Sequence, residues 1–408
     1  MKVLVWTQYY WPEHFHINEV TQSLKNAGEE VTVLTGKPNY PNGAIFNGYR
    51  ALGIVKETHC GIDVIRLPLR SRKNGKALNL SLNYLSFVAS CYVFGPLLLR
   101  RKHFDVVLVY AVSPLIQALP AILFARTRGI PLVLWVQDLW PDSIISAGYP
   151  LNRYFVRALE WICRYIYRNS DLLLIQSEGF RGEILQNGIK NEKITFHANS
   201  SGLTKAARRS RPDIEAIVKD IEGRFSIVYA GNIGSVQSLD VAVKAAVLLR
   251  EHKDVRFYLI GGGSMALEIK DEINKNSLEN LVLHPWVSPD EIGNIFQAAS
   301  VLFVSLKNDE KINKTIPNKL LVYMSAGKPI IMSGSGEAAN LLKLANAGLV
   351  CPPGDPKSLA DAILYLKNLD INSLKSLGNN GENYFLENFE LNNQTKKLMK
   401  LFREIVAA

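Results

Sequence analysis

The sequence predicts an α/β protein made of two Rossmann-like, doubly wound domains that face a central cleft. Apolar runs rich in β-branched residues alternate with segments of helical periodicity, and this alternation occurs in two sets of similar length. The chain of 408 residues also exceeds what one hydrophobic core usually supports, so two domains are expected. In such folds ligands bind beyond the carboxyl ends of the strands, which places the expected site in the cleft.

The first set of strands lies in residues 1–203, which we assign to an N-terminal domain. Its runs are almost continuously apolar, as is typical of parallel strands buried on both faces. Helices are predicted over residues 17–28 and 115–129. The predicted strands cover 2–8, 30–36, 62–68, 106–111, 132–137, 171–177 and 194–200.

One segment of this half, residues 78–99, carries no charged side chain. Its length approaches the ~20 residues of a membrane-spanning helix. A true span would have to leave and re-enter the domain, because the next strand begins directly afterwards. We therefore expect one or two helices in the membrane interface near 78–102, and a buried core helix is the alternative. Basic residues flank the segment: Arg70, Arg72, Lys73, Lys76, Arg100, Arg101 and Lys102.

The second set of strands lies in residues 204–385, which we assign to a C-terminal domain. Residues 201–224 are polar and basic and are interpreted as the linker into this domain. The last segment, 386–408, is predicted to be a helix that packs back toward the N-terminal domain. The predicted strands cover 226–231, 255–263, 281–286, 301–306, 329–334 and 348–354.

The net charge of +10 is concentrated in the first half of the chain. Residues 1–200 contain 22 Lys and Arg against 14 Asp and Glu, an excess of eight positive charges. A basic half suits an anionic partner such as nucleic acid, a lipid headgroup or a lipid diphosphate. No nucleic-acid motif accompanies the basic residues, so we expect a lipid partner and no nucleic acid.

Neither the cysteines nor the histidines show the spacing of a metal site. The four cysteines are far apart and form no C-x-x-C pair, which indicates thiols without a disulfide framework. The histidines include no H-x-x-H or H-E-x-x-H pattern. We expect no metal and no other cofactor.

Two loops of the second half together favour a site for a nucleotide diphosphate. The first, 229–234, follows a β-branched run, and the second, 315–329, places Lys319 at the start of an apolar helix. Backbone N–H groups at helix starts bind phosphate, and a lysine adds a point charge. The alternative is two ordinary strand-to-helix turns. The candidate residues for binding this diphosphate are Gly231, Asn232, Ile233, Gly234, Pro317, Asn318 and Lys319.

A third glycine-rich loop, Gly261–Ser264, follows another predicted strand. It lacks the G-x-G-x-x-G spacing and the acidic partner of a dinucleotide-binding loop, which argues against NAD. Gly262 is therefore predicted either to line the pocket for the nucleotide base or only to turn the chain.

Three loops of the first half carry polar and aromatic residues where a cleft floor is expected. In the loop after the first strand, Glu13, His14 and His16 can exchange protons and Phe15 can stack on a sugar, although Pro12–Glu13 equally suits a helix start. Tyr40 belongs to a loop rich in turn formers that can also be purely structural. Asp138 and Trp140 follow an apolar strand, where Asp138 can act on an acceptor hydroxyl or cap the next helix.

In their order along the chain, these motifs resemble those of the family 4 glycosyltransferases with the GT-B fold. The resemblance covers essentially the whole chain and is strongest to a bacterial branch that builds O-antigen, capsule or colanic acid. That branch includes N-acetyl-L-fucosamine transferases. The motifs are QYYWPEHFHINEV (8–20), TGKPNYPNG (35–43), VQDLWPDSI (136–144), AGNIG (230–234) and IPNKLLVYMSAGKP (316–329).

The resemblance implies a retaining, metal-independent transfer of a sugar from a UDP-sugar to an acceptor on undecaprenyl diphosphate. N-acetyl-L-fucosamine or another N-acetylhexosamine is the implied sugar, and the cytoplasmic face of the bacterial inner membrane is the implied location. The N-terminal domain would bind the acceptor and the C-terminal domain the nucleotide sugar. Lys319 would stabilise the leaving diphosphate, and Asp138 and Glu13 would position the acceptor hydroxyl. The implied acceptor-binding residues are His14, Phe15, His16, Tyr40 and Trp140.

Several positions depart from the family pattern and leave Lys319 as the main cation for the diphosphate, with Lys314 as a second candidate. Glu337 is then our candidate for a replacement contact to the ribose or the sugar. The losses keep open a non-catalytic, membrane-associated assembly partner as an alternative. A UDP-sugar 2-epimerase, which shares the two-domain architecture, is a second alternative, but it would not explain the charge-free segment 78–99. This chain has His16 where close relatives have an arginine, and Gln137 where many members have a histidine. Asn232 and Gln237 take the places of an arginine and a lysine, and Lys314 and Val322 take the places of two glutamates.

Overall fold

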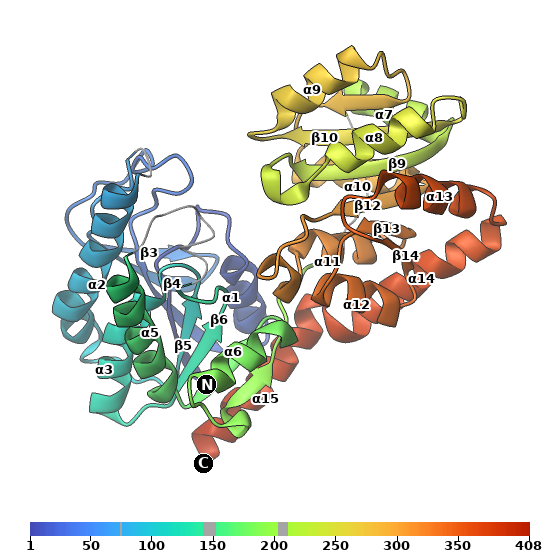
Figure 1. Ribbon diagram of the computed structural model, residues 1–408. Helices are drawn as coiled ribbons and strands as arrows, with labels where there is room; N and C mark the ends of the chain where they lie inside the picture. Colours follow the sequence, from blue (N-terminus) through green and yellow to red (C-terminus); the bar gives the residue numbers. More distant parts are fainter. Residues whose placement is uncertain (74–75, 142–151, 203–210) are drawn as a thin grey trace. The chain divides into compact units, whose positions relative to one another are not determined.

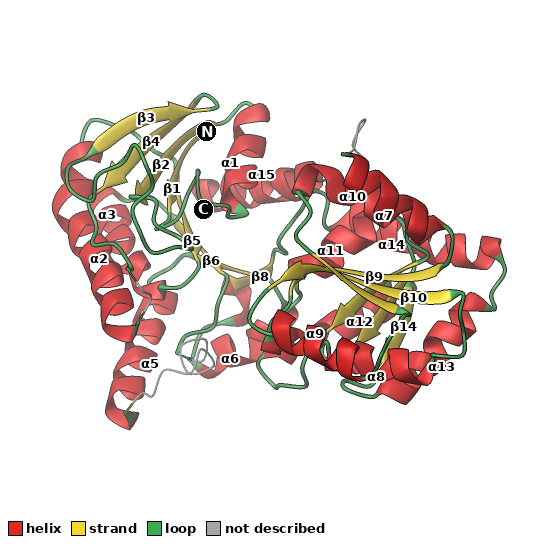
Figure 2. Ribbon diagram, turned by 90° about the horizontal axis from the view of Figure 1, so that it is seen from above, coloured by secondary structure: helices red, strands yellow, loops and turns green. Residues whose placement is uncertain are grey.

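The computed structural model describes residues 1–73, 76–141, 152–202 and 211–408 and divides into two compact units. Unit 1 comprises residues 1–199 together with 391–408, and unit 2 comprises residues 200–390. The boundary lies four residues before the predicted one at 203. Each unit is a mainly parallel sheet with helices on both faces, which confirms the predicted pair of doubly wound domains (Figures 1 and 2).

Unit 1 contains an eight-stranded sheet in the order β3-β4-β2-β1-β5-β6-β7-β8. All neighbours are parallel except β3, which runs antiparallel to β4 at the edge. The sequence prediction missed β3, because its residues VKETH are short and polar, as befits an edge strand. The strands are β1 (Lys2–Trp6), β2 (Glu30–Gly36), β3 (Val55–His59), β4 (Ile62–Leu67), β5 (Val106–Ala111), β6 (Leu132–Val136), β7 (Leu172–Ile175) and β8 (Ile194–Phe196).

Helices cover both faces of this sheet with separate apolar cores. The core on one face is shared by α2, α3 and α5, and α1 and α15 cover the other face. Leu398 and Phe402 of α15 are fully buried against the strands of unit 1. The helices are α1 (Ile17–Asn26), α2 (Ala77–Leu99), α3 (Ala118–Arg128), α5 (Arg153–Arg168), α6 (Arg181–Gln186) and α15 (Leu391–Ala407).

The charge-free segment forms one helix, α2, that includes Pro96. It is the one helix in the described ranges that is long and apolar enough to cross a membrane, and 33% of its most apolar window is buried. Its inner face is packed tightly, since a Cβ at Gly95 would lie 3.1 Å from the Trp6 ring. The helix is thus part of the unit 1 core along one side and exposed along the other.

Unit 2 contains a six-stranded parallel sheet in the order β11-β10-β9-β12-β13-β14. The strands are β9 (Phe225–Asn232), β10 (Val255–Gly262), β11 (Leu281–His284), β12 (Val301–Ser305), β13 (Ile330–Ser333) and β14 (Gly348–Cys351). The helices are α7 (Pro212–Glu222), α8 (Asp240–Leu248), α9 (Ala266–Lys275), α10 (Pro289–Ala298), α11 (Asn318–Ser325), α12 (Glu337–Leu344), α13 (Pro356–Lys367) and α14 (Ile371–Asn388).

The helix α7 corrects the interpretation of residues 212–222 as part of a linker, and residues 203–210 of the predicted linker lie outside the described residues. Ile214 and Ile221 of this helix are fully buried in unit 2. They are seven residues apart and so share one helix face. The polar composition of the segment concealed an amphipathic helix.

Candidate active site

The most unusual charged group in unit 2 is Lys319, the second residue of α11. Its Nζ lies 3.3 Å from the centroid of the Tyr229 ring in β9. No carboxylate among the described residues forms an ion pair with this ammonium group. Burial lowers the pKa of Lys319 from 10.5 to about 7. A desolvated cation with only a ring face beside it is well suited to receive an anion.

Tyr323 fixes α11 against the same end of β9. Its hydroxyl accepts a hydrogen bond from the Ala230 N–H (2.7 Å) and donates one to the Ala230 carbonyl (3.2 Å). Since residues four apart share a helix face, Lys319 and Tyr323 both face this strand end. The position of the cation is therefore set by the packing of α11 on the sheet.

Two glycines make room for this arrangement. Gly231 has a φ of 137°, and a Cβ there would lie 3.0 Å from the Nζ of Lys319. Gly261 pairs with Gly231 across the strands, and a Cβ at Gly261 would lie 2.0 Å from the Gly231 carbonyl oxygen. Glycine at both positions allows the lysine head and the neighbouring strand to approach the loop.

The structure corrects the prediction that the N–H groups of residues 231–234 jointly cradle a diphosphate. The Ile233 N–H donates to the Gly262 carbonyl (2.8 Å), and the Gly234 N–H donates to the Oε1 of Gln237 (3.1 Å). A 3₁₀ turn, Ser235–Gln237, also separates the loop from α8. Two of the expected donors are thus already bonded, one to the end of β10 and one to Gln237, which increases the importance of Lys319.

The remaining donor-site candidates lie in separate loops of unit 2. Pro317 and Asn318 form the start of α11, and Glu337 is the first residue of α12. A Cβ at Gly262 would lie 2.9 Å from the Nε1 of Trp286, whose side chain is 60% exposed. An exposed indole beside a glycine offers a flat surface for a planar ring.

Glu13 in unit 1 is buried and fully engaged with backbone donors. Its Oε1 accepts from the N–H groups of Asn39 (2.8 Å) and Tyr40 (2.7 Å), and its Oε2 accepts from Tyr10 (3.3 Å). Burial raises the pKa of Glu13 to about 7, although these N–H groups oppose the shift. Glu13 therefore fastens the loop after β2 to the loop after β1, and both its oxygens already have partners.

The fastened loops bring aromatic rings and an arginine together. The rings of Tyr9 and Phe15 stack with their centroids 4.9 Å apart, and Phe15 lies 5.2 Å from Tyr40. The guanidinium of Arg72 lies 5.0 Å from the Tyr40 centroid. The structure thus groups Phe15 with Tyr40 and adds two residues that were not site candidates: Tyr9 of the first motif, and Arg72, which the sequence placed in the basic flank of residues 78–99.

The two histidines of the first loop have different surroundings. His14 is exposed. The ring of His16 packs edge-on against Trp135 at a centroid distance of 5.8 Å, and His197 packs against the same indole at 4.8 Å. Burial lowers the pKa of His197 to about 3, so this imidazole is neutral at physiological pH. His16 and His197 are therefore held beside the indole at the sheet.

Asp138 is half-buried just beyond β6. Its Oδ2 accepts from both the N–H and the hydroxyl of Ser113, each at 3.0 Å. The Trp140 indole donates to the same hydroxyl (2.8 Å) and is only 8% exposed, so it supports Ser113 and offers little ring surface to a sugar. The other oxygen of Asp138 has no hydrogen-bond partner in the described chain. Residues 142–144 of this motif lie outside the described residues.

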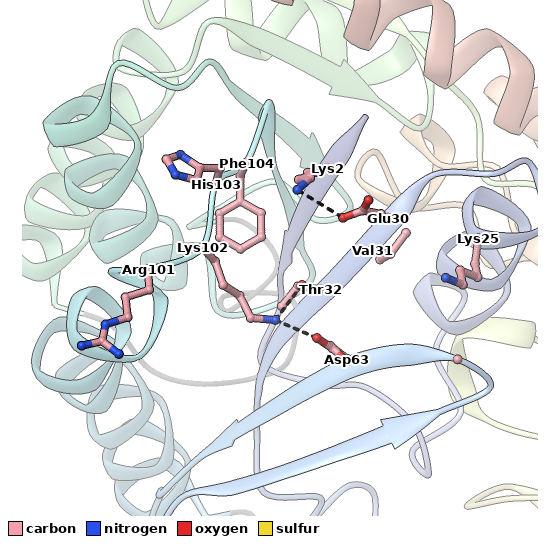
Figure 3. Close-up of a pocket in the computed structure, with 11 residues that line it drawn as sticks. Lys2, Lys25, Glu30, Val31, Thr32, Asp63, Arg101, Lys102, His103 and Phe104 are labelled. Atoms are coloured by element: carbon pink, nitrogen blue, oxygen red, sulfur yellow. Dashed lines mark hydrogen bonds and ion pairs between the residues drawn. The ribbon is translucent and has the colours of Figure 1, made fainter.

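A cavity of about 340 Å³ opens at the amino ends of the unit 1 strands, the end of the sheet opposite to the loops described above (Figure 3). It is lined at the amino ends of β1 and β2, where Lys102 pairs with Asp63 (2.7 Å) and Lys2 with Glu30 (3.6 Å). Because ligands of doubly wound sheets bind beyond the carboxyl ends of the strands, we do not place the candidate site there. Within the described residues, no three His, Cys, Asp or Glu side chains could together hold a metal ion.

Comparison with known proteins identifies both units. Residues 14–200 match the glycosyl transferase 4-like domain, and residues 224–368 match the glycosyl transferases group 1 model. The chain is 25% identical over 337 residues to the colanic acid biosynthesis glycosyl transferase WcaI of Escherichia coli K12, covering 80% of this chain and 82% of that protein. It is 23% identical over 294 residues to the glycosyltransferase WbjE of Pseudomonas aeruginosa, covering 71% and 73%.

Solved structures share the fold at lower identity. Anabaena Alr3699/HepE in complex with UDP superimposes with a TM-score of 0.71 at 13% identity, covering 99% of this chain and 100% of that one. Sucrose-phosphate synthase of Thermosynechococcus elongatus gives a TM-score of 0.75 at 14% identity, covering 100% and 99%. The fold is that of the GT-B proteins, and the two domain matches make this chain a glycosyltransferase, with a glycosyl transferase 4-like domain in residues 14–200 and a glycosyl transferases group 1 domain in residues 224–368.

Proposed function

We propose that this glycosyltransferase moves a sugar from a UDP-sugar to an acceptor on undecaprenyl diphosphate, with retention of the anomeric configuration. The product would serve bacterial surface polysaccharide such as O-antigen or capsule, and N-acetyl-L-fucosamine or another N-acetylhexosamine is the first sugar to test. The relative WcaI carries a colanic acid biosynthesis name, and Alr3699/HepE was crystallised with UDP and with UDP-glucose. Both observations support the proposal. The cytoplasmic face of the inner membrane is the proposed location.

The donor assignment rests on the desolvated ammonium group of Lys319, which forms no ion pair within the described residues. A desolvated ammonium without a counter-charge lowers the stability of the protein, and an anionic ligand would remove that penalty. The diphosphate of a UDP-sugar supplies two adjacent negatively charged phosphate groups, and both can approach the single ammonium group of a lysine. The exposed Trp286 beside Gly262 is a candidate surface for the uracil ring.

The proposed chemistry places the positive charge where the leaving group develops negative charge. The bond between the anomeric carbon and the phosphate oxygen breaks, and the acceptor hydroxyl oxygen bonds to that carbon on the same face. The hydroxyl proton passes to the departing phosphate or to Asp138. Lys319 stabilises the released UDP, which is the electrostatic role that usually contributes most to such catalysis. We propose that this lysine acts without a metal ion.

Asp138 is the acceptor-side candidate because one of its oxygens is committed and the other is available. The committed oxygen is held by two hydrogen bonds from Ser113, which orients the carboxylate. The available oxygen can accept a hydrogen bond from an acceptor hydroxyl. Glu13 acts through the loop that it fastens, and we assign it a positioning role.

A transfer assay tests the proposal. Protein purified in detergent is incubated with radiolabelled UDP-N-acetylhexosamines and a lipid extract that contains undecaprenyl-diphosphate-linked acceptors, with and without EDTA. We expect label in the butanol-extracted lipid, unchanged by EDTA and lost with Lys319→Ala. Label that stays on a free, epimerised nucleotide sugar would instead support the epimerase alternative. Absence of both UDP binding and transfer in folded protein would support the non-catalytic alternative.

A further inference from the structure

Buried polar groups without partners gather at the carboxyl ends of the unit 1 strands. Within the described residues, seven buried side-chain polar atoms lack a hydrogen-bond partner. Four of them belong to residues at most three positions past the end of a unit 1 strand, which are Gln8, Lys37, Gln137 and Asn199. Because buried polar groups in folded proteins nearly always have partners, this concentration at the ligand-binding end of the sheet indicates groups that a ligand completes.

Three neighbouring strands of this sheet are followed by side-chain amides. Gln137 directly follows β6, Gln176 directly follows β7, and Asn199 lies three residues past the end of β8. Since β7 lies between β6 and β8 and pairs in parallel with both, the three residues lie next to one another at the carboxyl end of the sheet. We call them the amide row. Their side chains are 7–8% exposed, so each keeps a small accessible edge.

The amide row leaves one donor and one acceptor unpaired. The Nδ2 of Asn199 donates to the Oε1 of Gln176 (3.5 Å), and the Nε2 of Gln176 donates to the Gln137 carbonyl (3.3 Å). Both distances are long for hydrogen bonds of this type. The Nε2 of Gln137 and the Oδ1 of Asn199 have no partner in the part of the chain that the structure describes. The row therefore has capacity to donate at one end and to accept at the other.

The backbone that carries the row is fixed by hydrogen bonds to its neighbours. The Gln137 N–H donates to the Ala111 carbonyl (3.1 Å). After β8, the His197 N–H donates to the Ile175 carbonyl (2.9 Å), and the His197 carbonyl accepts from the Trp135 indole (3.1 Å). The terminal torsion of an amide side chain is broad, so each amide can turn toward a ligand while its backbone stays in place.

The chemistry of the row favours a neutral ligand with hydroxyl groups. The three amides carry no charge, and the carboxylate of Asp138, next in the chain after Gln137, disfavours an anion. A hydroxyl both donates and accepts, so it matches the unpaired donor and the unpaired acceptor. A nucleobase has the same capacity but also needs a ring face for stacking. The indoles of this segment offer none, since Trp135 is 0% and Trp140 is 8% exposed.

We propose that the amide row binds the hydroxyl groups of the acceptor's sugar and so helps to set which acceptor is used. This inference rests on the proposed transfer reaction, in which unit 1 holds the acceptor. The reacting hydroxyl would meet Asp138, whereas the row would bind hydroxyls of the same sugar that do not react. The row thus acts on the affinity for the acceptor and not on the chemical step.

Saturation-transfer difference NMR of the full-length protein tests the proposal without donor or turnover, so its failure is distinct from failure of the transfer reaction. The probes are the methyl glycosides of glucose, galactose, rhamnose and N-acetylglucosamine. We expect saturation transfer to at least one of them. The double variant Gln137→Met/Asn199→Leu should bind that glycoside about tenfold more weakly, because hydrogen bonds between neutral groups are lost.

The matched control is Asn280→Leu. Asn280 is also 8% exposed with an unpartnered Oδ1, but it precedes β11 in unit 2, at the amino end of a strand. This variant should bind the glycoside like the unchanged protein. Gln137→Met alone repeats the test if the double variant unfolds, because the Gln137 side chain forms no hydrogen bond within the described residues. In the transfer assay, the double variant should need more lipid acceptor for half-maximal rate, with an unchanged maximal rate.

Three results would overturn the proposal. The first is that none of the glycosides binds the unchanged protein, and the second is that the double variant and Asn280→Leu bind the glycoside equally well. The third is that the double variant loses affinity for uridine instead of the glycoside, because the row would then bind the nucleotide base.

Discussion

Glu13 in unit 1 is buried and Lys319 in unit 2 is half-buried, and both lie beside a first sheet strand, but their surroundings differ. The Glu13 carboxylate accepts three backbone N–H groups from two loops. The Lys319 ammonium lies over the Tyr229 ring, with no carboxylate paired to it in the described residues. The first charge is satisfied within the protein, whereas the second lacks a counter-charge.

This difference indicates a structural role for Glu13 and a ligand-binding role for Lys319. A buried charge with a full set of local hydrogen bonds holds its loops together, and its removal leaves those donors unsatisfied. A desolvated charge without a partner lowers stability by itself, so its presence at a strand end favours a role in ligand binding. On this comparison, variants of Lys319 should damage function and variants of Glu13 should damage stability.

Lys319→Ala should have the largest effect on function. Loss of one electrostatic donor to a transition state typically lowers kcat by about 10²–10³-fold, and we expect a loss of that order in sugar transfer. The thermal unfolding midpoint should not fall, because the removed cation was desolvated. Lys270→Ala is the matched control, since Lys270 is an exposed lysine of α9 and is not among the site candidates. A transfer rate unchanged in Lys319→Ala would contradict the assignment.

Asp138→Asn should act on the acceptor step alone. Asparagine keeps an oxygen for the hydrogen bonds from Ser113 but loses the negative charge at the available position. Because a positioned acid or base contributes about 10²-fold or more, we expect transfer to fall by about that factor. Affinity for UDP, measured by titration calorimetry, should stay the same, and an equal loss of UDP affinity would argue against an acceptor-side role.

Glu13→Gln should lower stability. The glutamine amide group would face at least one backbone N–H that the carboxylate now accepts, which leaves a buried donor unsatisfied at a cost of about 1–3 kcal/mol. Urea unfolding measures this loss. A variant with unchanged stability and abolished transfer would instead make Glu13 a catalytic residue.

The pH dependence of the same residue is a smaller effect. The pKa of Glu13 is about 7 in the folded protein and 4.5 in the unfolded chain. The folded state therefore binds more protons between these values, and the contribution of Glu13 to stability is present below pH 4.5 and lost as the pH rises through 7. Unfolding of the unchanged protein and Glu13→Gln at several pH values in this window should show the difference narrowing as the pH rises.

Gly231→Ala should have the smallest effect on donor binding. The added Cβ would meet the Lys319 head at 3.0 Å and would sit at a φ of 137°. We expect the lysine to shift, with UDP affinity falling about tenfold, of the order of the 1–3 kcal/mol associated with such backbone strain. Gly129→Ala is the control, since its φ is also positive and open space surrounds its Cβ position. If both variants lowered UDP affinity equally, the loss would come from backbone strain and not from displacement of Lys319.

Much of the fold follows from local sequence pattern, whereas the partners of the site residues do not. Alternating apolar runs indicated two doubly wound sheets, and the position of Lys319 before an apolar run indicated a helix start. The prediction could not show that Gln237 takes the Gly234 N–H or that Tyr229 lies beneath Lys319, because these contacts depend on how the loop folds and how α11 packs on β9. The edge strand β3 and the helix α7 were missed because polar residues mask their apolar positions.

The most direct test of the account is a calorimetric titration with UDP of the unchanged protein, Lys319→Ala and Lys319→Arg. Lys319 has a pKa of about 7 when the site is empty, so binding above that pH must return a proton to it. We predict that UDP affinity of the unchanged protein falls by up to roughly tenfold for each pH unit above 7. Lys319→Arg, which stays charged, should bind with little pH dependence, and Lys319→Ala should bind weakly throughout. Equal UDP affinity of all three proteins at every pH would contradict the central claim that Lys319 binds the diphosphate of the donor.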